Sequence, residues 1–164
     1  MNKLISKIKL QNIAIAFGIA IFFIADRGLK IFAQHLAPDV YFKLLGDWAL
    51  FRFTPNYYIS FSIPFSGILL NITIILIIIA LIYYIFYLIL SKKNKSLSHK
   101  ERKQTAILLT IILFGAISNI QDRLAYGYVI DFLELRYFTV FNLADIMISA
   151  GTLSLIIKTL RTKK

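Results

Sequence analysis

The sequence predicts an all-α membrane protein: a bundle of four transmembrane helices with a small β-like or amphipathic loop region outside the cytoplasm. The first observation behind this prediction is composition. Of the 164 residues, 59% are hydrophobic and only 16% are charged, whereas soluble domains have about 25% charged residues. The mean hydropathy is +0.74. The second observation is the presence of long uncharged runs, since crossing the hydrocarbon core takes about 20 mainly apolar residues.

Four apolar runs are candidates for membrane spans. The first run, residues 10–25, holds 16 residues and reaches full length by borrowing a turn from "DRGLKIF". The second run holds a loop and then a helix, which Pro64 and Gly67 place from about Ser66 onward. The fourth run spans the membrane only if Asp145 lies within it or at its mouth. We therefore expect a single integral membrane domain over residues 1–164, with spans at about 10–30, 66–90, 104–122 and 140–158.

The net charge of +11 is distributed as in a membrane protein rather than a nucleic-acid-binding protein. The N-terminus, the "KKNKSLSHKERK" loop and the C-terminal "KTLRTKK" hold 13 of the 19 Lys and Arg residues and one acid, Glu101. Four spans place these pieces on one side, which the positive-inside rule makes cytoplasmic. Both termini are then cytoplasmic, and the expected partners include membrane lipids but no nucleic acid. A cleaved signal peptide is the alternative for the basic N-terminus, but no small-residue cleavage site follows it.

Two connections face the outside in this topology. The first, residues 30–65, contains Trp48 and "WALFRFTPNYYISFSI", where aromatic and β-branched residues recur. Short strands on the membrane surface and an aromatic anchor belt are both consistent with that composition. The second connection, residues 123–139, is short.

The chemistry available to this chain is limited to carboxylates, hydroxyls and amines. There is no Cys, and two His residues offer little for a metal site, so no cofactor or metal is expected. The carboxylates are unevenly placed, because every aspartate falls on the outward half of the chain. These are Asp26, Asp39, Asp47, Asp122, Asp131 and Asp145.

The segment "GAISNIQDR" combines polar residues on one helix face. Gly115, Asn119, Asp122 and Arg123 share that face, since residues three and four apart are neighbours. Asn119 is deep enough to need a hydrogen-bond partner, so we expect it inside the bundle. An ion pair between Asp122 and Arg123 that only orients the helix is the structural alternative.

Asp145 lies in the apolar stretch "FNLADIMISAG". If Asn142 caps the helix, Asp145 at the third position stabilises the positive helix end by about 0.3–1 kcal/mol. A carboxylate deep in the membrane costs about 2.5–3.5 kcal/mol, so capping does not account for a deep site. Ser149 and Thr152 continue the same face, which predicts a polar stripe turned into the bundle.

Asp131, between Ile130 and Phe132 in "YVIDF", is the natural partner of Asp145. A loop aspartate taken alone is usually structural. Two carboxylates a few ångströms apart cannot both ionise easily, so they share one proton. The ionised group can then take a proton from water while the protonated group polarises a peptide carbonyl, which is aspartic protease chemistry.

Two other function classes fit acids in membrane spans. A small proton-coupled transporter or channel would need polar groups through the whole membrane depth, whereas runs such as "IILIIIALIYYIFYLIL" carry almost none. A catalytically inert membrane scaffold would tolerate loss of both Asp131 and Asp145.

In order along the chain, "DRGLK", an Asn in the first outward loop, "GAISNIQDRLAYGYVIDF" and "FNLADIMISAG" match a known pattern. With these motifs the chain resembles the bacterial lipoprotein signal peptidases, also called signal peptidase II, over essentially its whole length. The resemblance implies an aspartyl endopeptidase that spans the bacterial cytoplasmic (inner) membrane several times, with its active site toward the outer face. We expect it to be a monomer. Its substrates would be diacylglyceryl-modified prolipoproteins, cut just before the lipidated Cys.

The resemblance also assigns roles to residues of this chain. The catalytic pair falls on Asp131 and Asp145. The residues that would support the pair and the substrate are Asn119, Asp122 and Arg123 of "NxxDR", Asn142, the loop residue Asn56, and Asp26 and Lys30 of "DxxxK". One departure stands after Asn56, where "NYYISF" has Tyr58 and Ser60 in place of the Gly and Ala that the family usually carries. The two tyrosines of this segment should stiffen or refill the surface that meets the substrate.

Overall fold

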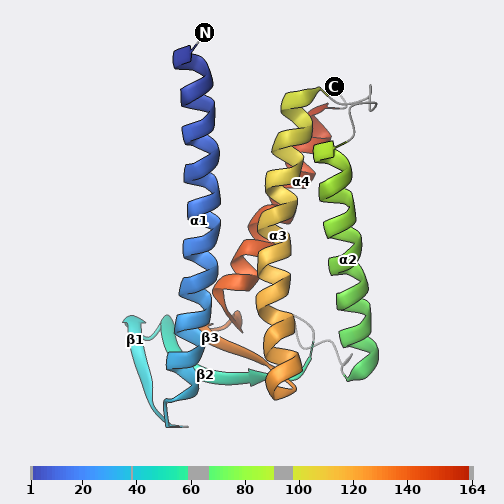
Figure 1. The fold of residues 1–164 in the computed structure, drawn as a ribbon. Coiled ribbons are helices and arrows are strands. Elements are labelled where there is room, and N and C mark those ends of the chain that lie inside the picture. The colour runs from blue at the N-terminus through green and yellow to red at the C-terminus, as the bar shows by residue number, and fades with distance from the viewer. Residues whose placement is uncertain (1, 38, 59–66, 91–97, 163–164) are drawn as a thin grey trace.

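The computed structural model describes residues 2–37, 39–58, 67–90 and 98–162, and forms four helices with one antiparallel sheet at the end of the bundle (Figure 1). The beginning of the first helix and the end of the last helix lie at the opposite end from the sheet (Figure 1). The helices are α1 (Asn2–Gln34), α2 (Ile68–Leu90), α3 (His99–Tyr126) and α4 (Leu143–Thr162).

Three of these helices are long and apolar enough to cross a membrane, namely α2, α3 and residues Leu143–Arg161 of α4. They coincide with the last three predicted spans. α1 is not among them, so the predicted span at residues 10–30, and with it the set of four spans, remains a prediction. So does the extent of the single membrane domain.

Helix α3 begins at His99, before the predicted span start at residue 104, because a capping box at Ser98 starts the helix. The Ser98 side chain accepts a hydrogen bond from the Glu101 N–H at 3.2 Å, and Glu101 Oε2 accepts one from the Ser98 N–H at 2.8 Å. The helix ends where Gly127 adopts the left-handed conformation, with φ of 81°. The predicted start of α2 near Ser66 lies outside the described residues, and α2 begins at Ile68.

The sheet joins both outward connections. Its strands are β1 (Tyr41–Leu45), β2 (Ala49–Asn56), β3 (Val129–Leu135) and β4 (Thr139–Phe141), and they are hydrogen-bonded in that order. Strands in the first connection were one of the two predicted alternatives and are confirmed. Strands in the second connection were not predicted, because β3 acquires its partner β2 only through a long-range antiparallel pairing.

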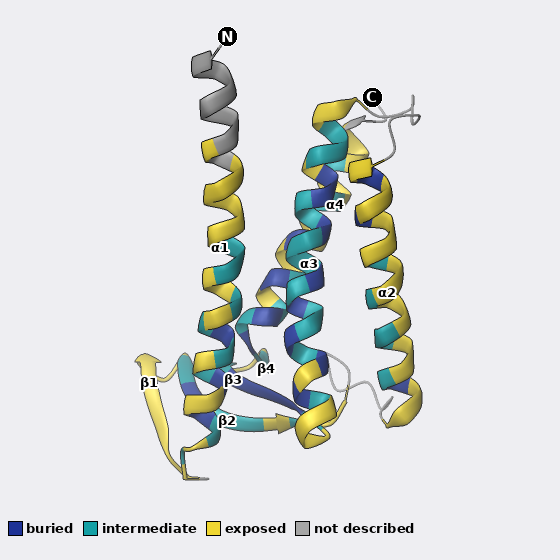
Figure 2. Ribbon diagram, viewed as in Figure 1, coloured by how far each residue is buried: buried dark blue, intermediate teal, exposed yellow. Residues whose placement is uncertain are grey.

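Two buried clusters hold the fold together. The first lies between α2 and α3, where Ile85 and Leu88 pack against the α3 side chains Leu109 and Leu113. The second attaches the sheet to α1 and consists of Ala33, Phe51, Ile130 and Phe132. Elsewhere the outward faces of the helices are apolar and exposed, most clearly on α2 (Figure 2). An apolar surface of this extent is what a lipid-facing helix bundle requires.

Helices α3 and α4 approach closely at Gly115. A Cβ at this position would lie 2.6 Å from the Ala144 carbonyl oxygen and 2.8 Å from Cγ1 of Ile148. Small residues allow helix backbones to approach in this way. The contact sets the depth at which the first turn of α4 lies against α3, and Asp145 belongs to that turn.

Candidate active site

Strand β3 turns Asp131 away from the core. Side chains alternate between the two faces of a strand, and Ile130 and Phe132 are buried in the core cluster between the sheet and α1. Asp131 therefore faces the other way, opposite Thr54 of β2. Two residues further along β2, Asn56 is its diagonal neighbour, and Asn56 Nδ2 donates to Asp131 Oδ2 at 2.9 Å.

The first turn of α4 positions Asp145. Asn142 caps this helix, since its Oδ1 accepts from the Asp145 N–H at 2.9 Å, and Asp145 Oδ2 accepts from the Asn142 N–H at 3.3 Å. Asp145 Oδ1 also accepts from Asn119 Nδ2 at 2.8 Å. The predicted cap is thus confirmed, because Asp145 Oδ2 closes it, while Oδ1 turns to Asn119 of α3.

Asn142 links the two carboxyl groups. Its Nδ2 donates to Asp131 Oδ1 at 2.7 Å and to the Ile130 carbonyl oxygen at 3.3 Å, while its Oδ1 is held by the helix cap. Asp131 and Asp145 both line one cavity of about 650 Å³ between the sheet and α4. Tertiary structure therefore brings together the two aspartates that the sequence singled out.

Burial, and after it the nearby negative charge of Asp145, raise the pKa of Asp131 to about 7. Hydrogen bonds from Asn56 and Asn142 act in the opposite direction, since they stabilise the ionised form. Asp131 is only 2% exposed. Near neutral pH the Asp131 carboxyl group is therefore protonated in a large fraction of molecules, whereas an ordinary aspartate is ionised.

A buried cluster of ionic side chains lies next to the Asp131–Asp145 pair. Lys30, with no exposed surface, contacts Asp26 at 3.1 Å and Asp122 at 2.8 Å. Arg27 also pairs with Asp122, at 2.5 Å, and Ser118 donates to Asp26 at the same distance. Two acids and two bases therefore neutralise one another, as a buried ionic group requires.

This cluster fixes the backbone next to each aspartate of the pair. Asp122 Oδ2 accepts from the Ile130 N–H at 3.3 Å, and Asp26 Oδ1 accepts from the Ala144 N–H at 3.0 Å. Ile130 precedes Asp131, and Ala144 precedes Asp145. The cluster also reaches Asp145 through a side chain, because Lys30 Nζ donates to Asn119 Oδ1 at 2.8 Å.

Three expectations need correction or extension. The alternative ion pair within "DR" is wrong, because Asp122 pairs with α1 while Arg123 donates to the Tyr58 carbonyl oxygen at 2.9 Å. The polar stripe of α4 holds only in part: Ser149 lines the cavity, whereas Thr152 is exposed and lies outside the lining. Ser60 lies outside the described residues.

Sequence reasoning missed Arg27 and Ser118. The sequence held a signal for each of these two residues. Arg27 belongs to the motif "DRGLK", and Ser118 lies four residues before Asp122 on the same helix face. In the part of the chain that the structure describes, no group of three His, Asp or Glu side chains is arranged to hold a metal ion.

Comparison with known families gives this arrangement its context. The model of the signal peptidase (SPase) II family matches residues 18–161. The chain belongs to the signal peptidase II family. The expected family is thereby confirmed, and with it the expectation of a peptidase family. Together with the apolar helices, membership of signal peptidase II makes the chain a protein of the bacterial inner membrane.

Curated relatives and solved structures agree with this family. A lipoprotein signal peptidase of Chlamydia trachomatis is 51% identical over 73 residues, which are 42% of this chain and 41% of the relative. One of Moorella thermoacetica is 47% identical over 55 residues, covering 34% and 37%. The chain thus matches about two fifths of the length of these relatives. A solved bacterial membrane enzyme shares the fold, with a TM-score of 0.75 at 22% identity over 92% of this chain and 90% of that one.

Proposed function

We propose that this protein is an intramembrane aspartyl endopeptidase that removes signal peptides from diacylglyceryl-modified prolipoproteins, cutting before the lipidated Cys. The observation that supports it most directly is the pair formed by Asp131 and Asp145, which line one cavity and are bridged by Asn142. Membership of the signal peptidase II family supports the reaction class and the substrate class.

In this proposal Asp131 carries the shared proton and Asp145 is ionised. Asp145 takes a proton from a water molecule, whose oxygen attacks the carbonyl carbon of the bond to be cut. Asp131 donates its proton to the carbonyl oxygen, giving a neutral tetrahedral diol. The C–N bond then breaks as Asp145 returns its proton to the leaving nitrogen and Asp131 recovers one from the diol, so that the pair regains its starting state.

The walls of the cavity suit an apolar substrate that arrives from the membrane. On α4 the residues below Asp145 that line it include Ile146, Ala150 and Leu153, and β4 contributes Val140 and Phe141. These side chains can receive the apolar segment of a signal peptide or the acyl chains of the lipidated Cys. Asn56 and Tyr58 also line the cavity, and the Arg123 guanidinium donates to the Tyr58 carbonyl oxygen.

The charge distribution supports an orientation in the membrane. The basic start of α3 and the basic end of α4 lie at the end of the bundle opposite the sheet (Figure 1). The positive-inside rule puts that end in the cytoplasm and the aspartate pair toward the outer face, with both termini cytoplasmic. We propose a single chain as the active unit, since one chain can supply both aspartates together with Asn56, Asn119 and Asn142, which donate hydrogen bonds to them.

The test is cleavage of a purified lipidated prolipoprotein by the full-length protein, read as the mass of the released products. Asp131→Asn and Asp145→Asn are each expected to remain folded and to lose detectable cleavage. Asp47→Asn is the matched control, because the Asp47 side chain is 61% exposed and pairs with the exposed Lys43. Full cleavage by both site variants would refute the assignment. Solute or proton flux in liposomes without any cleavage would instead favour a transporter.

A further inference from the structure

A second cavity, of about 390 Å³, lies far from the aspartate pair, toward the other end of the bundle. Its apolar walls come from three helices: Ile15, Ala16 and Ile19 of α1, Leu88 of α2, and Ala106 and Ile107 of α3. At one end it is lined by His99, Arg102 and Lys103. We call this cavity the α1–α3 groove. The proposed peptidase reaction uses none of its residues.

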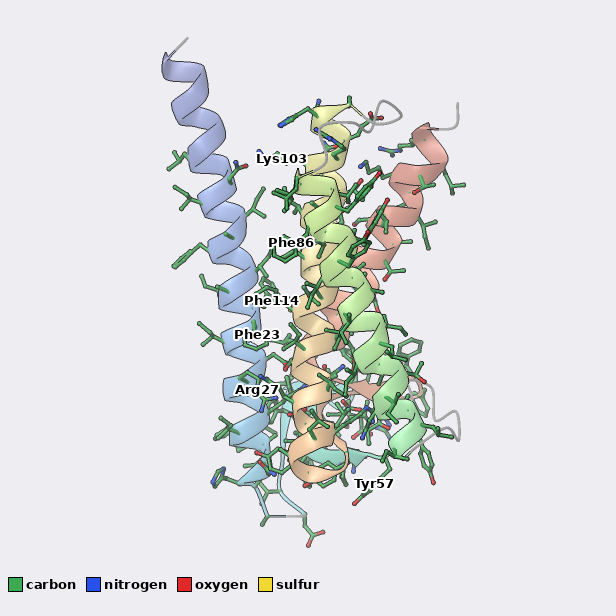
Figure 3. All side chains as sticks on the ribbon, turned by 45° about the vertical axis from the view of Figure 1, so that its right-hand side comes forward. Phe23, Arg27, Tyr57, Phe86, Lys103 and Phe114 are labelled. Carbon is green, nitrogen blue, oxygen red and sulfur yellow. The ribbon has the colours of Figure 1, made fainter. Side chains whose placement is uncertain are left out.

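The groove has a defined floor and a defined mouth. At the floor the rings of Phe23 and Phe114 meet edge to face, with centroids 5.5 Å apart (Figure 3). Lys103 lies at the other end of the same stretch of α3 (Figure 3). At 1.5 Å per residue, the distance from Phe114 to Lys103 along the helix is about 16 Å. This matches the depth of one leaflet, half of a hydrocarbon core of about 30 Å.

The two helices that form the groove run parallel and in register. Phe23 contacts Phe114, and Arg27 donates to the Ser118 carbonyl oxygen at 3.3 Å. Residues that are 91 apart in sequence therefore lie at the same height along the two helices. The same offset sets Asn12 level with Lys103, and both line the groove. Polar groups therefore gather at the mouth of the groove, while its deeper part is apolar apart from Thr110. The Thr110 hydroxyl is already bonded to the Ala106 carbonyl oxygen at 2.8 Å.

The charge at the mouth selects the class of occupant. His99, Arg102 and Lys103 line it, and no Asp or Glu is among the described residues that line the groove. Glu101, the acid nearest in sequence, accepts from the Ser98 N–H in the helix cap. A basic mouth above an apolar channel of one-leaflet depth fits a molecule with an anionic head and a long hydrocarbon tail.

We propose that the α1–α3 groove is a binding site for an anionic glycerophospholipid. One acyl chain lies between α1 and α3 as far as Phe23 and Phe114, and the phosphate contacts Lys103 at the mouth. Such a lipid fills the space between α1 and the rest of the bundle. It also links α1, which carries Asp26 and Lys30, to α3.

Lipid retention by the full-length protein tests this proposal. The protein is reconstituted into nanodiscs of equal phosphatidylglycerol and phosphatidylcholine and released into mild detergent, and the lipids that stay bound are counted by native mass spectrometry. Phosphatidylglycerol is expected to be retained over phosphatidylcholine. Lys103→Gln should lower its retention about fivefold, the equivalent of about 1 kcal/mol for one charge, and Lys103→Arg should preserve it.

Control variants separate this site from general membrane charge. Arg161→Gln removes an exposed charge at the end of α4 and should leave retention unchanged. Ala16→Trp fills the groove and should abolish retention, whereas Ala14→Trp, outside the lining, should not. If Ala16→Trp does not fold, the two Lys103 variants decide. Excess inorganic phosphate is expected not to displace the lipid.

Three results would overturn the proposal. The first is equal retention of the two lipids, and the second is retention that Lys103→Gln leaves unaltered. The third is a dimer that Ala16→Trp abolishes while Ala14→Trp does not, because a second copy of the chain would then occupy the groove. None of these readouts depends on peptidase activity, so failure here leaves the proposed function standing.

Discussion

Asn142 offers the sharpest test of how the pair works, because one side chain both caps α4 and stabilises the ionised form of Asp131. In Asn142→Ala the cap bond to the Asp145 N–H, 2.9 Å long, is lost together with the 2.7 Å bond to Asp131. Loss of an Asn cap costs about 0.5–2 kcal/mol of stability. The variant is therefore expected to unfold at a lower temperature.

The effect on titration follows from the second bond. A hydrogen bond to a charged acceptor is worth about 1.5–3 kcal/mol, and one to a neutral acceptor about 0.5–1.5 kcal/mol. The difference, about 1–1.5 kcal/mol, corresponds to about one pH unit. Since Asn142 lowers the pKa of Asp131, its removal raises that pKa above about 7. Asp131 then keeps its proton to higher pH, so the alkaline limb of the pH–rate profile moves upward.

The assay is the initial rate of prolipoprotein cleavage from about pH 5 to about pH 9, fitted for the apparent pKa values of the pair. Asn142→Ser is the matched variant, because Ser is also a good helix cap but is too short to reach Asp131. It should recover the stability lost in Asn142→Ala and still show the shifted limb. An alkaline limb that stays in place or moves to lower pH in Asn142→Ala would refute the assigned roles.

Three further predictions concern the surroundings of the pair. Gly115→Ala should cost about 1–3 kcal/mol, because its Cβ meets the Ala144 carbonyl oxygen; Gly18→Ala, with nothing within 4 Å, should not destabilise. Thermal unfolding in detergent checks both, and equal melting temperatures would contradict the packing argument. Lys30→Met should cost about 3–5 kcal/mol by leaving two buried carboxylates without their shared cation, whereas Lys43→Met at the exposed pair with Asp47 should leave the melting temperature unchanged. Tyr58→Gly should lower KM for substrates with bulky residues beside the cut bond. Its stability should be retained, because Arg123 bonds the backbone oxygen, and an unchanged substrate preference would count against this role.

Local sequence determined a large part of this protein. Hydropathy alone identified the apolar helices α2, α3 and α4, because a bilayer demands unbroken apolar runs of fixed length. The cap of α4 was also readable, since Asn142 and Asp145 lie three residues apart and bond within one turn. Motif order supplied the family, and the cost of placing a carboxylate in an apolar segment predicted a functional role for Asp145.

Only tertiary structure decided how these parts meet. Asp131 gains its partner Asn56 from 75 residues away through the pairing of β2 with β3, a strand that the short second connection did not reveal. Asp122 pairs with Arg27 across 95 residues rather than with its sequence neighbour Arg123. Contacts between residues so far apart in the chain produce no periodic pattern in the local sequence. They are selected by burial, because a carboxylate or ammonium group removed from water must find an opposite charge or a donor wherever the fold provides one.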